Sequence, residues 1–208
     1  MTERGVPRTV AFGPLQVEHD DTVLVPRPWT LEQSRWAAAL LPDAPAGPVL
    51  EVCAGVGHIG LVAVAGSGRS LVLVDADAHA CELARRNAAQ VDEPVEVRHG
   101  PMDEVVGPDE RFAAVLADPP WVPSDGVAAH PDDPEWAIDG GADGLDVART
   151  CVRLVGRVLL PGGGAVLQLG AADQALALQD DLDAAGLATV RVHQADRGAL
   201  VLLERTPA

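Results

Sequence analysis

Lysine is absent from this chain of 208 residues, so all 15 basic residues are arginines, and 31 acidic residues outnumber them. The formal net charge is therefore −16 at pH 7. A charge of this sign weakens long-range attraction to nucleic acid and to anionic membranes, and we expect neither as a partner. GC-rich coding, which enriches Ala, Gly, Val, Asp and Arg, explains the acidity equally well and would leave the substrate open.

Cysteine is scarce and long apolar runs are missing. Cys53, Cys81 and Cys151 are widely spaced and form no Cys-x-x-Cys pair, which favours reduced core thiols over disulfides. No apolar run approaches the roughly 20 residues of a membrane-spanning helix, and the first ten residues lack the apolar centre of a secretion signal. The histidines show no metal-ligand spacing. We therefore expect a soluble cytoplasmic protein without a bound metal, and the oligomeric state stays open.

Apolar segments of strand length alternate with amphipathic segments along most of the chain. Apolar residues at helical spacing predict helices over 31–41, 78–90, 147–160 and 173–185. Short β-like segments (TVAF, LQVE and TVLV, around residues 10–25) precede the first of these helices. Seven further segments predict the core strands, over 48–52, 70–75, 95–99, 112–117, 164–170, 188–194 and 199–205.

This alternation predicts an α/β fold with a mostly parallel, doubly wound sheet. Only 195–198 separate the last two strands, too few residues for a helical crossover, so these strands should form an antiparallel hairpin. Seven strands ending in this way match the Rossmann-like sheet of class I methyltransferases, which use S-adenosylmethionine (SAM). We expect a single domain over 1–208, with an N-terminal extension (1–45) of short strands and a helix before the core (46–208).

A glycine-rich turn follows the first predicted core strand. Residues 49–60 read VLEVCAGVGHIG and satisfy the G-x-G-x-x-G fingerprint of a dinucleotide site. Asp75 closes the next strand, where it would accept hydrogen bonds from the ribose that NAD and SAM share. Glu51 favours SAM, because an anion suits a cationic amino group better than a pyrophosphate. Gly55 and Gly57 would let the methionine end approach the backbone, although a turn without ligand is the alternative.

The second motif, Asp118-Pro119-Pro120-Trp121, follows the fourth core strand, which flanks the switch point of a doubly wound sheet. Methyl transfer needs a nitrogen lone pair aligned with the methyl carbon. The Asp118 carboxylate and the Pro119 carbonyl would accept N–H protons of the acceptor, the prolines stiffen the loop, and Trp121 would stack on a planar group. The motif predicts the acceptor site of an N-methyltransferase; a proline-rich turn beside a core tryptophan is the alternative.

Other segments extend the predicted cofactor site. Met102 and Asp103 follow the third core strand and would reach the adenine, although a solvent-facing loop fits them equally well. Residues 119–143 are rich in Pro, Asp and Gly and long enough for a functional loop or lid. The predicted SAM contacts are Thr30, Glu51, Cys53, Ala54, Gly55, Gly57, Asp75, Ala76, Met102, Asp103 and Asp118.

Together these motifs resemble the HemK/PrmC-type methyltransferases, which modify the glutamine side-chain amide of peptide-chain release factors. The resemblance covers about residues 12–205 and includes VLVPRPWT (23–30), the glycine turn, DPPW, GGADGLDVAR (140–149) and DRGALVLLE (196–204). It implies that Gly55, Gly57 and Asp75 hold SAM and that residues 118–121 bind the acceptor.

Some positions depart from the family pattern. Asp118 and Trp121 replace the Asn and Tyr of Asn-Pro-Pro-Tyr, Trp29 replaces an acidic residue, and Gln168 replaces the Glu of Glu-x-Gly. We also expect the family's N-terminal helical domain to be missing. Ionised Asp only accepts hydrogen bonds, which suits an amino group better than an amide. The leading interpretation is a SAM-dependent protein-glutamine methyltransferase. A small-molecule N-methyltransferase, an NAD-dependent oxidoreductase and a non-catalytic SAM-binding protein are the alternatives.

Overall fold

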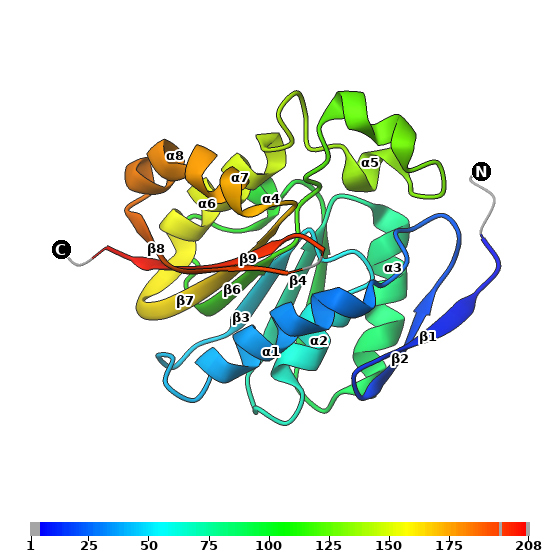
Figure 1. Ribbon diagram of the computed structural model, residues 1–208. Coiled ribbons are helices and arrows are strands. Elements are labelled where there is room, and N and C mark those ends of the chain that lie inside the picture. The colour runs from blue at the N-terminus through cyan, green and yellow to red at the C-terminus, as the bar shows by residue number, and fades with distance from the viewer. Residues whose placement is uncertain (1–4, 196, 207–208) are drawn as a thin grey trace.

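The computed structural model describes residues 5–195 and 197–206, and a seven-stranded sheet forms its centre (Figure 1). The strands are β3 (Val49–Val52), β4 (Leu71–Asp75), β5 (Val95–His99), β6 (Phe112–Ala117), β7 (Leu159–Leu169), β8 (Leu187–Gln194) and β9 (Ala199–Arg205). They lie in the order β5-β4-β3-β6-β7-β9-β8. The first five of this order are parallel, whereas β9 is antiparallel to both β7 and β8. The predicted doubly wound sheet with a C-terminal antiparallel hairpin is confirmed.

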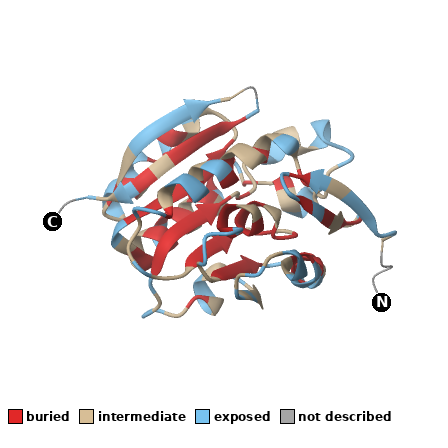
Figure 2. Ribbon diagram, turned by 90° about the horizontal axis from the view of Figure 1, so that it is seen from below, coloured by how far each residue is buried: buried red, intermediate tan, exposed pale blue. Residues whose placement is uncertain are grey.

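Helices cover both faces of the sheet (Figure 1). One face carries α1 (Leu31–Leu40), α2 (His58–Val64) and α3 (Ala78–Asn87), which η2 (Ala88–Gln90) follows. The other face carries α4 (Met102–Val105), α6 (Asp146–Val158), α7 (Ala172–Ala177) and α8 (Gln179–Ala184). Side chains alternate along a strand, so Val49 packs against the first helical layer and Leu50 against the second. The central strands β3, β4 and β6 are consequently buried along their whole length (Figure 2).

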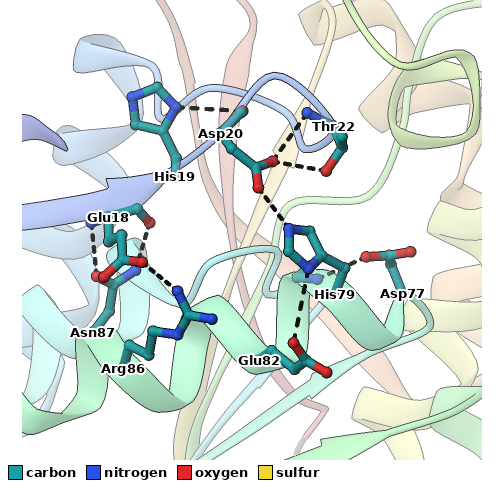
Figure 3. Close-up of polar contacts among 10 residues, drawn as sticks. Glu18, His19, Asp20, Thr22, Asp77, His79, Glu82, Arg86 and Asn87 are labelled. Carbon is teal, nitrogen blue, oxygen red and sulfur yellow. Dashed lines mark hydrogen bonds and ion pairs between the residues drawn. The ribbon is translucent and has the colours of Figure 1, made fainter. Parts of the chain in front are cut away.

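An N-terminal hairpin, β1 (Arg8–Phe12) and β2 (Leu15–His19), is fixed to α3 by polar contacts (Figure 3). The Asn87 amide donates to the carbonyl of Glu18 at 3.0 Å and accepts from its N–H at 2.8 Å. His79 Nε2 lies 2.6 Å from Asp20 Oδ2, and Arg86 pairs with Glu18. These contacts hold the start of the segment that runs from residue 20 to the short helix η1 (Pro28–Thr30).

The long loop after β6 has structure of its own. It contains η3 (Ser124–Ala129) and α5 (Glu135–Ile138), and Val122 and Asp139 form a parallel bridge between its two ends. The Gly140 N–H donates to the Val122 carbonyl at 2.8 Å. A Cβ at Gly144 would lie 2.5 Å from the Trp121 carbonyl oxygen, which leaves no room there for a side chain. The GGADGL motif therefore closes this loop onto the chain that follows β6.

Some predicted boundaries are wrong. The TVLV segment (22–25) is not a strand, because it runs along a cavity without a strand partner. β7 begins at Leu159 rather than 164, and the preceding helix ends at Val158, because Leu159 pairs with Phe112 and an irregularity in the ladder accommodates the glycines. The helices predicted over 173–185 and 78–90 are broken, the first at the buried Leu178 and the second after Asn87.

Candidate active site

The glycine turn between β3 and α2 uses the left-handed region of backbone space. Cys53, Gly55 and Gly57 have φ angles of 54°, 52° and 80°. A Cβ at Gly57 would lie 2.7 Å from Leu73 Cδ1, so the turn packs against β4 and excludes a side chain there. A Cβ at Gly55 would meet nothing within 4 Å, so backbone is open at that position. Cys53 adopts the same region at a cost that a glycine would not have.

Asp75 lies at the end of β4, directly opposite the glycine turn. Its carboxylate accepts from the Gly55 N–H at 2.7 Å through Oδ2 and from the Asp77 N–H at 2.8 Å through Oδ1. Burial raises the pKa of Asp75, while these backbone hydrogen bonds act in the opposite direction. Each oxygen keeps a second lone pair, so Asp75 can still accept hydrogen bonds from a ligand.

Glu51 lies in β3 and is 1% exposed. Its Oε2 accepts from the Gly60 N–H of α2 at 2.9 Å, and its Oε1 has no hydrogen-bond partner in the described part of the chain. Burial raises the pKa of Glu51 well above its ordinary value. The side chain thus supports the first turn of α2 and does not reach the wall of the neighbouring cavity.

Asp118 stands at the end of β6, next to β3 in the sheet. The side chain is half-buried, and no hydrogen bond to its carboxylate is present among the described residues. Burial raises the pKa of Asp118 to about 7. An unpartnered carboxylate with this pKa can accept a hydrogen bond or take up a proton near neutral pH.

Trp121 points to the end of β7. A Cβ added at Gly170 would lie 2.5 Å from Trp121 Cε3, so the indole packs directly on that glycine. The Trp121 carbonyl accepts from Gln174 Nε2 at 3.2 Å. The ring is not part of the cavity wall, which leaves its predicted stacking on the acceptor without a contact surface in this conformation.

A cavity of about 480 Å³ connects the glycine turn to Asp118. Of the residues predicted from sequence, Thr30, Cys53, Ala54, Gly55, Asp75, Ala76, Met102, Asp103, Asp118 and Pro120 line it. Glu51, Gly57, Pro119 and Trp121 do not. The structure thus gathers most predicted cofactor contacts and two residues of the DPPW motif around one space.

Sequence reasoning missed part of the wall. Residues 23–25 and Arg27 cover one side, and Trp136, half exposed on α5, contributes from the long loop. His58 also lines the cavity; burial lowers its pKa to about 3, so its imidazole is neutral at pH 7. The first turns of α6 add Asp146, Val147 and Thr150. Two motifs in the sequence could have indicated part of this wall. The VLVPRPWT segment (23–30) contains residues 23–25 and Arg27, and GGADGL (140–145) directly precedes Asp146.

Among the described residues, no group of three or more His, Cys, Asp or Glu side chains is placed to hold a metal ion. None of the described helices is long and apolar enough to cross a membrane.

Residues 33–130 match the protein family described as methyltransferase small domain. Over these residues the chain is similar to this methyltransferase family. The match includes the glycine turn, Asp75 and the DPPW motif, and it favours a methyltransferase over an NAD-dependent oxidoreductase. The same assignment is supported by individual relatives.

The chain is 34% identical over 166 residues to the ribosomal protein uL3 glutamine methyltransferase of Bradyrhizobium diazoefficiens, covering 73% of this chain and 52% of the relative. It is also 34% identical over 168 residues to the release factor glutamine methyltransferase of Mycobacterium tuberculosis, covering 74% of this chain and 54% of the relative. The chain therefore spans about half the length of these curated relatives. The resemblance to HemK/PrmC-type methyltransferases is confirmed.

Solved structures support the fold. The crystal structure of a methyltransferase from Pyrococcus furiosus superposes with a TM-score of 0.66 at 18% identity, covering 93% of this chain and 89% of the other. The chain therefore has the fold that its strand order predicts.

Proposed function

We propose that this chain is a SAM-dependent N-methyltransferase that methylates the side-chain amide of a glutamine in a protein. The observation that carries the proposal is Asp118, an unpartnered carboxylate with a pKa of about 7 in the wall of the cavity that also contains the glycine turn. The named activities of the uL3 and release factor relatives supply the acceptor class.

The glycine side of the cavity fits the cofactor. Asp75 has free lone pairs for the ribose hydroxyls, and Gly55 offers open backbone to the methionine end. Met102 and Asp103 line the same cavity and are the proposed contacts of the adenine. Glu51 acts on this site through α2 and the turn. When bound, SAM supplies an activated methyl group on a sulfonium, and the remaining proposed contacts in the cavity wall are Thr30, Cys53, Ala54 and Ala76. Gly57 lies outside the wall and acts by shaping the turn.

The DPPW side of the cavity orients the acceptor. The Asp118 carboxylate accepts an N–H of the amide and holds the nitrogen lone pair toward the methyl group. The Pro119 carbonyl, predicted to accept the second N–H, belongs to a residue outside the cavity wall, so we assign the amide to Asp118 alone. Pro120 forms the wall beside the nitrogen. Trp121 positions this loop by packing on Gly170. A buried carboxylate with a pKa near neutrality can also receive the proton that the amide loses.

The direct test is methyl transfer from labelled SAM to purified release factor, to ribosomal protein uL3 and to a fractionated lysate, with mass spectrometry of the labelled residue. The expected product is a methylated glutamine, and Asp118→Ala should lose transfer while still binding SAM by calorimetry. Full transfer by Asp118→Ala would contradict the role of Asp118. SAM binding without transfer to any fraction would favour a non-catalytic protein.

A small-molecule amine is the second candidate acceptor. The observation in its favour is that position 118 is Asp rather than Asn, because ionised Asp offers acceptors only and matches an amine better than an amide. Label that appears in the small-molecule fraction and not in protein would establish this alternative.

We also propose that residues 1–45 and 46–208 act as one methyltransferase unit, because the hairpin, η1 and α1 pack on the core and residues 23–30 supply part of the cavity wall. The proposed acceptors in translation lead us to propose a cytoplasmic location. Limited proteolysis that released the N-terminal segment without loss of SAM binding would contradict the single unit.

A further inference from the structure

Exposed arginines gather beside α1 in a protein that is otherwise strongly acidic. The guanidinium carbon of Arg191 lies 4.7 Å from the centroid of the Trp36 ring, and that of Arg197 lies 5.3 Å from the Trp29 ring. Both arginines are exposed and both tryptophans are partly buried. We refer to Trp29, Trp36, Arg191 and Arg197 as the arginine–tryptophan ledge.

The fold places these four residues along one side of the molecule. Trp29 and Trp36 are seven residues apart in the continuous segment of η1 and α1, which is two helical turns and returns to the same face. Arg191 and Arg197 both belong to the β8–β9 hairpin. His193 extends the ledge, with its ring centroid 5.9 Å from that of Trp36.

The ledge is continuous with the cavity. Arg27 lines the cavity, and its guanidinium carbon lies 5.7 Å from the Trp29 ring centroid. Arg27 also forms an ion pair with Asp133 in the loop that carries Trp136. A chain whose acceptor side chain entered the cavity on this side would therefore run over Trp29 and toward Arg197.

Among the described residues, the two arginines of the ledge have no ion-pair partner. Arg27 is paired with Asp133 and Arg35, nearby on α1, is paired with Glu32, whereas neither Arg191 nor Arg197 has an ion pair with any described residue. Contact with an indole restricts a guanidinium without using its N–H donors. A guanidinium restricted in this way can form a bidentate pair of hydrogen bonds with a carboxylate.

We propose that the arginine–tryptophan ledge binds an acidic segment of the protein acceptor, next to the residue that enters the cavity. This inference rests on the proposed function, because it concerns the acceptor of the same site. To a short acidic segment the ledge offers the two guanidinium groups of Arg191 and Arg197. A long polyanion such as RNA would also meet the rest of a surface whose net charge is −16, which disfavours it.

The binding test uses a fluorescein-labelled hexaglutamate peptide and fluorescence anisotropy. The double variant Arg191→Glu, Arg197→Glu should bind the peptide about tenfold more weakly than the wild type or worse. Arg8→Glu, Arg153→Glu makes the same change in charge at exposed sites on β1 and α6, and it should bind like the wild type within about twofold. Unchanged SAM affinity in both double variants shows that each is folded.

The proposal fails if hexaglutamate does not bind the wild type, or if the two double variants weaken its binding equally. It also fails if a single-stranded RNA of equal charge binds more tightly than hexaglutamate and its binding depends on Arg191 and Arg197. The last result would assign the ledge to nucleic acid instead.

A kinetic test separates this inference from the proposed function. Once an acceptor protein is labelled, Arg191→Glu, Arg197→Glu should raise its KM about tenfold and leave kcat within about twofold, because the ledge binds outside the cavity. Loss of kcat at unchanged KM would contradict a binding role. If no protein is labelled while hexaglutamate binding still depends on the ledge, the proposed function fails and the acidic-segment site stands. If a protein is labelled but Arg191→Glu, Arg197→Glu changes neither hexaglutamate binding nor KM, the proposed function stands and the acidic-segment site fails.

Discussion

The substitution Asp118→Asn tests the chemistry of the site and its effect on stability together. With a pKa of about 7, the Asp118 carboxylate is about one-tenth ionised at pH 6 and about nine-tenths ionised at pH 8. If the ionised form holds the acceptor N–H, kcat/KM should rise about tenfold between these pH values. Asparagine keeps a neutral carbonyl acceptor in place, so Asp118→Asn should retain activity with a flat profile over this range.

The same pKa predicts a change in stability of defined sign. Folding raises the pKa of Asp118 from 3.8 to about 7, so its protonated form favours the folded state and this contribution is lost as pH rises from about 4 to about 7. The shift of about three units sets an upper limit of about 4 kcal/mol. Asp118→Asn should therefore increase the free energy of unfolding at pH 8 relative to the wild type, and the difference should shrink toward pH 4.5.

Urea denaturation at pH 4.5 and pH 8, followed by tryptophan fluorescence, measures this double difference, and initial rates of methyl transfer measure the activity profile. Asp125→Asn removes an exposed carboxylate outside the cavity and is the matched control. It should change neither the rise of kcat/KM between pH 6 and 8 nor the free energy of unfolding. The reasoning is refuted if the wild-type rate is flat from pH 6 to 8, or if Asp118→Asn keeps the wild-type rise.

Three substitutions test the backbone that frames the cavity. Gly57→Ala should destabilise the fold by about 2 kcal/mol and weaken SAM binding measured by calorimetry, because its Cβ would meet Leu73 Cδ1 at 2.7 Å and its φ is 80°. Cys53→Gly should increase the free energy of unfolding in urea by about 1 kcal/mol, because it removes a side chain from a backbone φ of 54°. An unchanged urea midpoint would show that no strain is stored at this residue. Gly170→Ala should displace the Trp121 ring and lower kcat about tenfold or more, and a shift in tryptophan emission would report the displacement. An unchanged kcat would show that Trp121 does not position the DPPW loop.

The sequence determined the sheet and the location of the chemistry. The seven core strands, the antiparallel pairing of the last two and the glycine turn each follow from local periodicity or turn chemistry, and all appear in the structure, with the start of β7 as the main difference in bounds. Asp75 and Asp118 could be identified because the carboxyl ends of β4 and β6 meet at the same edge of a parallel sheet.

Only the tertiary structure decided how the side chains meet. Glu51 turns to α2 because its strand face is covered by that helix, and Trp121 packs on Gly170 because the chain after β6 bends toward β7. Neither direction is encoded by local spacing. The TVLV segment (22–25), predicted as β-like, instead places residues 23–25 along the cavity and forms no strand. The arginine–tryptophan ledge joins residues more than 150 positions apart, a proximity that arises only when the β8–β9 hairpin pairs with β7 next to α1.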